Sequence, residues 1–111
     1  MMGVTALKPE MVDEVFHSLP PEGRMEILNV GIPFYRLNLE KRLERAQDKV
    51  LAFEARYRTT LRQLEADGLP DDADYAMHED YVEWRYWSRE LAGAQDTLHA
   101  LSLFPVASEP V

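Results

Sequence analysis

The residues of this sequence whose types and spacing suit metal chemistry are two pairs of a carboxylate and an imidazole. Glu14-x-x-His17 and Asp96-x-x-His99 have the i, i+3 spacing that di-iron helical bundles use. A complete site of that kind needs two further carboxylates that project into the bundle, and His99 falls toward the edge of its helix's apolar stripe. We therefore expect both pairs to be helix-surface residues, with no bound metal and no other cofactor.

The acidic residues after Gly68 share part of the pattern of a calcium-binding loop. Asp72, Asp74 and Glu83 match loop positions 1, 3 and 12. The sixth position holds Met77 where such a loop has glycine, so we exclude this type of site. The chain also has no Cys and no Gly-rich phosphate loop. Because no nucleophile with a neighbouring base is recognisable, we expect a protein that is not an enzyme.

The overall charge limits the partners that this protein can bind. Twelve Lys and Arg residues oppose twenty Asp and Glu residues, so the net charge is −8. A surplus of negative charge repels nucleic acid and anionic lipid, which disfavours both as partners. The sequence has no apolar run near the roughly 20 residues of a membrane span, and it opens without a secretory signal pattern. We expect a cytoplasmic protein whose 111 residues form one domain.

Two short helices are expected within residues 8–31. The first has apolar residues at i, i+3, i+4 and i+7, the spacing of one helical stripe; these are Val12, Val15, Phe16 and Leu19. Pro20-Pro21 ends this helix, because proline lacks the amide that the next turn needs. A second helix over 21–30 follows, and Gly31 is expected to cap it or to act as a hinge.

A regular heptad pattern predicts the first long helix over 34–66. Its apolar residues alternate in steps of four and three, with no Gly or Pro between them. They are Leu39, Leu43, Ala46, Val50, Phe53 and Tyr57. Thr60-Leu61-Arg62-Gln63 matches a capping box, which predicts a break near 58–60 and a restart of about two turns.

The second long helix is expected over 73–104, between an acidic start and Phe104-Pro105. At 100° per residue, one arc of this helix carries six apolar residues; they are Trp84, Trp87, Leu91, Ala94, Leu98 and Leu101. Both tryptophans are expected in the core. Residues 106–111 have little apolar surface, so we expect a flexible tail there.

These elements predict an all-α fold. Each long helix alone would leave its apolar stripe in water, and a short connection favours antiparallel neighbours. We expect an antiparallel, coiled-coil-like helical hairpin with two short N-terminal helices, forming a helical bundle in a single domain over 1–105. Whether the N-terminal helices pack on their own hairpin or on that of a second copy stays open.

Charge is distributed unevenly along the chain. Residues 32–66 contain eight basic and five acidic residues, and residues 67–111 contain two and ten. In an antiparallel hairpin the basic residues face the acid-rich helix, so we expect them to neutralise it in exposed ion pairs of about 0–1 kcal/mol each. Asp80 falls on the core-facing arc, so either the bundle opens there or an arginine such as Arg58 pairs with it, because a buried lone carboxylate is costly. The basic residues are Arg36, Lys41, Arg42, Arg45, Lys49, Arg56, Arg58 and Arg62.

A second stripe on the last helix is the candidate binding surface. Tyr75, Val82 and Tyr86 share a face that a two-helix hairpin leaves exposed. Either the N-terminal helices cover this face, or it contacts another subunit or protein, since tyrosine is enriched at interfaces. Together with neighbouring acids, the candidate partner-binding residues are Asp71, Asp72, Asp74, Tyr75, Glu79, Val82, Glu83 and Tyr86.

Several short motifs lie in order between residues 39 and 101. They are Leu43-Glu44, Phe53-Glu54-x-x-Tyr57, Leu61-x-x-Leu64, the acidic turn and Asp80-Tyr81-x-Glu83-Trp84. This arrangement resembles small acidic helical proteins of prokaryotes that are regarded as candidate antitoxins and are often encoded beside a small toxin-like partner. In that family a Gly-containing turn commonly follows the tyrosine, whereas Arg58-Thr59-Thr60 follows here. The resemblance implies that this protein binds and neutralises a partner protein.

The expected function is therefore a non-catalytic, acidic, antitoxin-like binding module. Its expected partner is a small basic protein, with a toxin encoded by a neighbouring gene as the candidate. A self-associating helical scaffold, such as a homodimer built through the same stripe, is the alternative, and a helical-bundle metal protein is the second alternative. The identity of the partner, the oligomeric state and any contribution to operator binding stay open.

Overall fold

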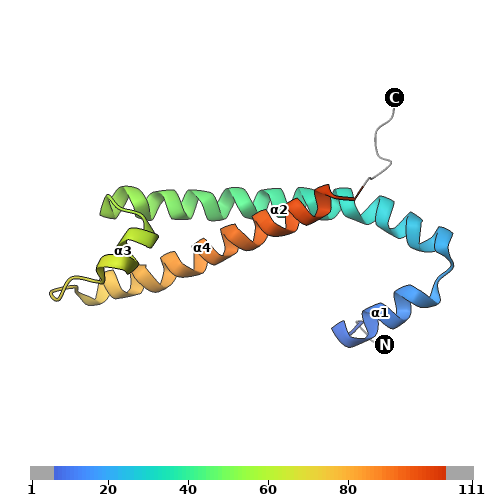
Figure 1. The fold of residues 1–111 in the computed structure, drawn as a ribbon, viewed down its shortest axis with the longest axis horizontal. Coiled ribbons are helices and arrows are strands. Elements are labelled where there is room, and N and C mark those ends of the chain that lie inside the picture. Colours follow the sequence, from blue (N-terminus) through green and yellow to red (C-terminus); the bar gives the residue numbers. More distant parts are fainter. Residues whose placement is uncertain (1–6, 105–111) are drawn as a thin grey trace, which may run out of the picture. The chain divides into compact units, whose positions relative to one another are not determined.

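The structure, a computed structural model, describes residues 7–104, and helices account for its fold (Figure 1). The helices are α1 (Pro9–Ser18), α2 (Pro21–Tyr57), α3 (Leu61–Asp67) and α4 (Tyr75–Ser102). No strand occurs within 7–104, and the predicted all-α fold is confirmed. The tail predicted for 106–111 lies outside the described residues.

The described chain divides into two compact units. An N-terminal unit ends at Phe34, and a hairpin unit begins at Tyr35. The sequence predicted one domain over 1–105, whereas here α2 contributes its first part to one unit and the remainder to the other. The hairpin unit contains all of the candidate binding residues.

The N-terminal helices differ from the prediction at Gly31. α1 begins at Pro9 as expected, but the second helix does not end at residue 30; α2 continues through Gly31 and Pro33 as far as Tyr57. The first predicted short helix is therefore confirmed, and the prediction of a separate second short helix before residue 34 is wrong. Ending a helix leaves up to four carbonyls or four amides without intrahelical partners. A single proline removes one amide donor, so continuing through Pro33 loses fewer hydrogen bonds than a break would.

From Tyr35 onward, α2 packs antiparallel to α4, as predicted (Figure 1). Near the end of α2, the ring of Phe53 lies 5.7 Å from that of Trp84, centroid to centroid, near the start of α4. Earlier in α2, the Arg36 guanidinium donates a hydrogen bond of 3.5 Å to the carbonyl oxygen of Leu101. Contacts that run in opposite order along the two helices confirm the helical hairpin.

The heptad seam supplies the core of the hairpin unit. Leu39, Ala46 and Phe53, spaced seven residues apart on α2, are buried, and so are Trp84 and Ala94 on α4. The alternate seam residues are only half-buried: Leu43, Val50 and Tyr57. One row of the seam therefore lies in the interior, and the other lies at the edge of the contact between the helices.

The break between α2 and α3 lies at residues 58–60, and two local features make it. Arg58 has φ 55°, a left-handed conformation that costs a residue with a Cβ roughly 1–2 kcal/mol. Thr60 then caps α3, because its Oγ1 accepts a hydrogen bond of 3.1 Å from the Gln63 amide. The Gln63 side chain bonds the Asp67 carboxylate instead of returning to Thr60, so half of the predicted capping box forms.

This sharp turn places α3 across the end of the hairpin. Leu64 of α3 is buried against Phe53 and Trp84, with Leu61 and Leu69 packed beside them. The apolar surface that α3 removes from water offsets the cost of the strained turn. As a result α3 bridges α2 and α4 where α4 begins (Figure 1).

Candidate protein-binding surface

The acidic turn before α4 has a structural role as well as a charge. Asp74 is the N-cap of α4, and its Oδ1 accepts a hydrogen bond of 2.9 Å from the Met77 amide. This cap satisfies one of the amides that a helix start leaves unpaired. One oxygen of Asp74 is therefore engaged within the chain, while Asp71 and Asp72 are exposed in the turn.

Five of the eight predicted residues line one open groove along the first three turns of α4. The groove has a volume of about 500 Å³, and its lining residues are Tyr75, His78, Glu79, Val82, Glu83 and Tyr86. Three of these lining residues are apolar or aromatic and largely exposed to solvent, with exposed fractions of 76% for Tyr75, 66% for Val82 and 53% for Tyr86. The predicted stripe is thus an exposed surface of the hairpin unit.

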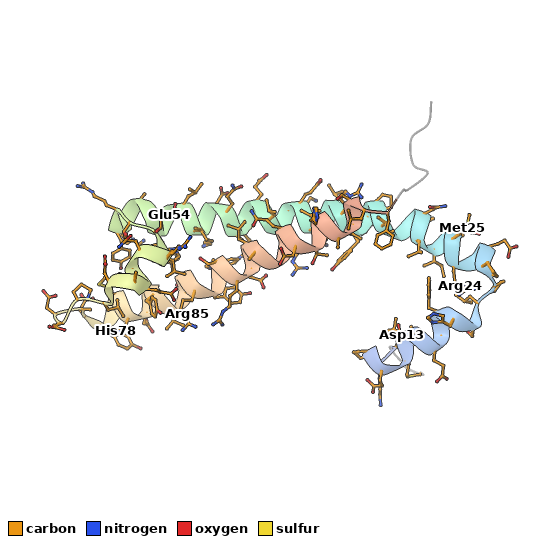
Figure 2. The ribbon with its side chains drawn as sticks, viewed as in Figure 1. Asp13, Arg24, Met25, Glu54, His78 and Arg85 are labelled. Carbon is orange, nitrogen blue, oxygen red and sulfur yellow. The ribbon has the colours of Figure 1, made fainter. Side chains whose placement is uncertain are left out.

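His78 is the one lining residue that sequence analysis did not select. Figure 2 shows it near the start of α4, where it lies three residues after Tyr75 and four before Val82. That spacing puts it on the same helical face, so the helical wheel contained the signal.

The remaining predicted residues do not join this groove. Asp72 and Asp74 line a separate depression of about 510 Å³ together with Arg56, Tyr57 and Asp80. Asp71 lines neither depression. The predicted site is therefore divided: its apolar and glutamate part forms one surface, and Asp72 and Asp74 line the other depression.

Asp80 is held by the end of α2. Its Oδ2 accepts a hydrogen bond of 2.6 Å from the Tyr57 hydroxyl and one of 2.7 Å from Arg56 Nη1. The predicted pairing with an arginine is confirmed, but the arginine is not Arg58, because α2 ends at Tyr57 and Arg58 has already left the helix. An arginine two residues earlier, still on the helix, faces α4 instead. The carboxylate is consequently paired, as its position on the core-facing arc required.

These contacts shift the ionisation of both groups. The hydrogen bond from Tyr57, followed by the hydrogen bond and the positive charge of Arg56, holds the pKa of Asp80 below its usual 3.8. The same bond to Asp80, together with burial, raises the pKa of Tyr57 above 10.0. At neutral pH the pair is therefore a carboxylate bound by a neutral phenol, the arrangement in which a charge-assisted hydrogen bond is strong.

Replacing Tyr57 with phenylalanine should lower the free energy of unfolding at pH 7 by about 1.5–3 kcal/mol, the range for hydrogen bonds to charged groups. Asp80 binds its proton less readily in the folded state than in the unfolded chain. Its contribution is therefore complete above the unfolded pKa of 3.8 and is lost as the pH falls through the lower folded value. Urea unfolding from pH 7 downward measures this effect.

The gap in stability between the wild type and Tyr57→Phe should accordingly shrink below about pH 4. Tyr35→Phe is the matched control, because Tyr35 is an exposed tyrosine on the same helix. It should unfold like the wild type at every pH. A gap for Tyr57→Phe that stays constant into acid would contradict the role given to Asp80.

The predicted neutralisation of α4 by α2 is only partial. Within the described residues, Arg42 pairs with Glu90 at 3.7 Å and Arg56 with Asp80 at 2.7 Å. Glu65 of α3 accepts a hydrogen bond from Tyr81 and pairs with Arg85 at 3.7 Å. The pairs within residues 7–104 are Arg42–Glu90, Arg56–Asp80 and Arg85–Glu65, so Glu79 and Glu83 have no ion-pair partner there. Their charges face solvent in the groove.

Two further cations of α2 cover an aromatic ring. Arg45 Cζ lies 5.3 Å and Lys49 Nζ 5.8 Å from the centroid of the Trp87 ring. These are cation–π distances. Trp87 is half-buried and packs against the core cluster that contains Trp84, so its predicted place in the core is confirmed in part. Arg45 and Lys49 therefore pack on Trp87. Within the described chain they form no ion pair with Glu79 or Glu83, which line the groove.

The described residues contain neither a cluster of metal ligands nor a helix suited to span a membrane. No group of three or more His, Asp or Glu side chains in the part of the chain that the structure describes is arranged to hold a metal ion. Among the helices of residues 7–104, none is both long and apolar enough to cross a membrane.

Comparisons of the whole chain with protein-family models, with curated proteins and with solved structures find no significant match.

Proposed function

We propose that this protein is a non-catalytic, antitoxin-like binding module that captures a small basic protein through the groove of α4 and blocks its working surface. The observation that carries the proposal is the groove itself: two tyrosines and a valine exposed beside two glutamates without ion-pair partners in the described chain. Exposed apolar patches rimmed by charge are typical of protein interaction sites.

The two kinds of side chain have separate roles in the proposed complex. Tyr75 and Tyr86 supply area that becomes buried on binding, and tyrosine is among the residues that contribute most to binding energy. Glu79 and Glu83 attract a basic protein and speed its approach, since complementary charge acts mainly on the association rate and on the choice of partner. The resemblance to candidate antitoxins supports the same role, and the proposal includes a cytoplasmic location, where toxin and antitoxin would meet.

Co-expression with the product of the neighbouring gene tests this function. We expect the neighbouring product to slow growth when expressed alone and growth to recover when this protein is present. The double variant Glu79→Lys/Glu83→Lys should lose the recovery and should no longer co-purify with the product, because the groove would repel a basic partner. Because Asp80 and the buried residues are untouched, the fold should persist, as circular dichroism would show.

The chain offers a matched control for this charge reversal. Glu40 and Glu44 are also exposed, four residues apart on a helix, and lie on α2. Glu40→Lys/Glu44→Lys makes the same change in net charge away from the groove, so it should protect as the wild type does. Equal loss of growth recovery in both double variants would mean that net charge alone determines protection. If the wild type gives no protection, the proposed function is contradicted.

Self-association is the second candidate function, and the N-terminal unit favours it. α1 contains no buried residue. The apolar side chains of this unit that stay exposed include Met11, Val12, Val15, Ile27, Leu28, Val30 and Phe34. Helices with solvent-exposed apolar faces commonly pack against another chain. Sedimentation over a range of concentrations tests this: a monomer throughout would exclude a scaffold built by self-association.

A further inference from the structure

We propose that the groove of α4 receives a basic amphipathic α-helix of the partner protein. This inference rests on the proposed function and deepens it, because it names the element that the groove recognises and the charge pattern of that element. The argument uses the spacing of the apolar residues, the placement of the two glutamates and the charges that a second copy of this chain would bring.

The apolar residues of the groove have the spacing of a helix-packing seam. Tyr75, Val82 and Tyr86 stand at i, i+7 and i+11 on one straight helix, and all three are exposed. They cover about 16 Å along the axis at 1.5 Å per residue. A facing helix places its own side chains at matching intervals, as coiled-coil partners do. A peptide that binds by β-strand addition would need an unpaired sheet edge, and residues 7–104 contain no strand.

The glutamates define one flank of this seam. At 100° per residue, Glu79 and Glu83 fall on one side of the line through the three apolar residues, and His78 falls on the other. The two glutamates are one helical turn apart, and neither has an ion-pair partner in the described chain. They therefore match two Lys or Arg residues one turn apart along one edge of a facing helix.

A second copy of this chain fits the groove less well. In a symmetric antiparallel pair, the flank with Glu79 and Glu83 faces the same flank of the other copy, and the groove offers no Lys or Arg there. Like charges across a helix pair destabilise it. Charge thus favours a foreign basic helix over an antiparallel second copy as the occupant.

Three synthetic peptides of 18 residues test the inference on the full-length protein. The first has Leu in a heptad seam and Lys along one flank; the second has the same composition in an order that spreads Leu around the helix; the third has Glu in place of Lys. Titration into ¹⁵N-labelled protein reports both affinity and the amides that shift. We expect the first peptide to shift the amides of residues 75–86 and to bind at least ten times more tightly than either of the others.

The groove variants locate the binding. Glu79→Lys/Glu83→Lys should weaken the first peptide at least tenfold, while Glu40→Lys/Glu44→Lys should leave it within twofold of the wild type. Equal affinity for the first and second peptides would overturn the inference, as would shifts centred on Asp72 and Asp80. Dimerisation of the wild type that Tyr86→Glu abolishes would also overturn it, by showing that a second copy fills the groove.

The result also separates this inference from the proposed function. If the neighbouring gene's product binds at the groove while no helical peptide does, the proposed function is supported and the inference of a basic helix is contradicted. If the first peptide binds at the groove as expected but the neighbouring product does not bind at all, the recognition chemistry stands and the proposed function is wrong. If neither binds, both are wrong.

Discussion

Replacing Trp84 with alanine should lower the free energy of unfolding by about 3–5 kcal/mol, the usual cost of removing a large aromatic side chain from a core. Trp84 is 0% exposed and stacks on Phe53 and Tyr57, with ring centroids 5.7 and 5.9 Å away. It also belongs to the cluster that holds Leu64, so it joins three helices. Urea unfolding followed by circular dichroism measures the loss.

Trp87→Ala is the matched control for this prediction, because it removes the same side chain three residues further along the same helix. Trp87 is half-buried and covered by the side chains of Arg45 and Lys49, which can move to fill the space. We expect less than half the loss of the Trp84 variant. A larger loss for Trp87→Ala would mean that the core of the hairpin does not lie where the structure places it.

A domain of this size is stable by only about 5–15 kcal/mol, so a loss as large as that of Trp84→Ala can abolish the cooperative unfolding transition. Trp84→Phe keeps the experiment decisive. The Trp84 Nε1 is buried without a hydrogen-bond partner among the described residues. A phenylalanine removes this unpaired donor while it keeps an aromatic ring between the helices, so the cost should be well below that of alanine. A loss equal to that of alanine would contradict the stacking role.

The hairpin was predictable from the sequence because its main cause is periodic. Apolar residues at steps of four and three define a face of a helix wherever they occur, and burial of that face follows from the hydrophobic effect. Leu39, Ala46 and Phe53 are accordingly buried. The start of α4 was predictable for a local reason, since Asp74 satisfies a helix amide directly.

The errors arose where a local signal competed with a longer-range one. Gly31 and Pro33 marked a helix end, yet the helix continues through both. The partner of Asp80 depended on the residue at which α2 ends, and a shift of one residue turns a side chain by 100° about the helix axis. Arg56 faces Asp80 because the helix persists to Tyr57. The sequence carried both arginines, and only the structure distinguishes them.

For the candidate site, the sequence predicted the apolar stripe but not the separate position of the acidic turn. The stripe of Tyr75, Val82 and Tyr86 followed from helical periodicity and is exposed as a groove. The aspartates of the turn were grouped with it because they are close in sequence. A turn changes the direction of the chain, so closeness in sequence does not place side chains on one face, and Asp72 lies in the other depression.

Replacing both Tyr75 and Tyr86 with alanine should weaken binding of the partner protein by at least 2 kcal/mol, or about 30-fold, while the fold is unaffected. Both side chains are more than half exposed in the free protein, so their removal costs little stability. In the proposed complex they become buried, and the lost area then reduces the affinity. Isothermal titration with the neighbouring gene's product measures the change, and thermal unfolding checks the fold.

Phe34 and Tyr35 provide the matched control, with exposed fractions of 76% and 46% against 76% and 53% for Tyr75 and Tyr86. Phe34→Ala/Tyr35→Ala removes comparable aromatic area from α2 and should leave the affinity unchanged. The charge variant Glu79→Lys/Glu83→Lys acts mainly on the association rate, whereas loss of the tyrosines should act on the dissociation rate. If the tyrosine variant slowed association and left dissociation unchanged, these rings would not be the anchors of the interface, and binding would depend on charge alone.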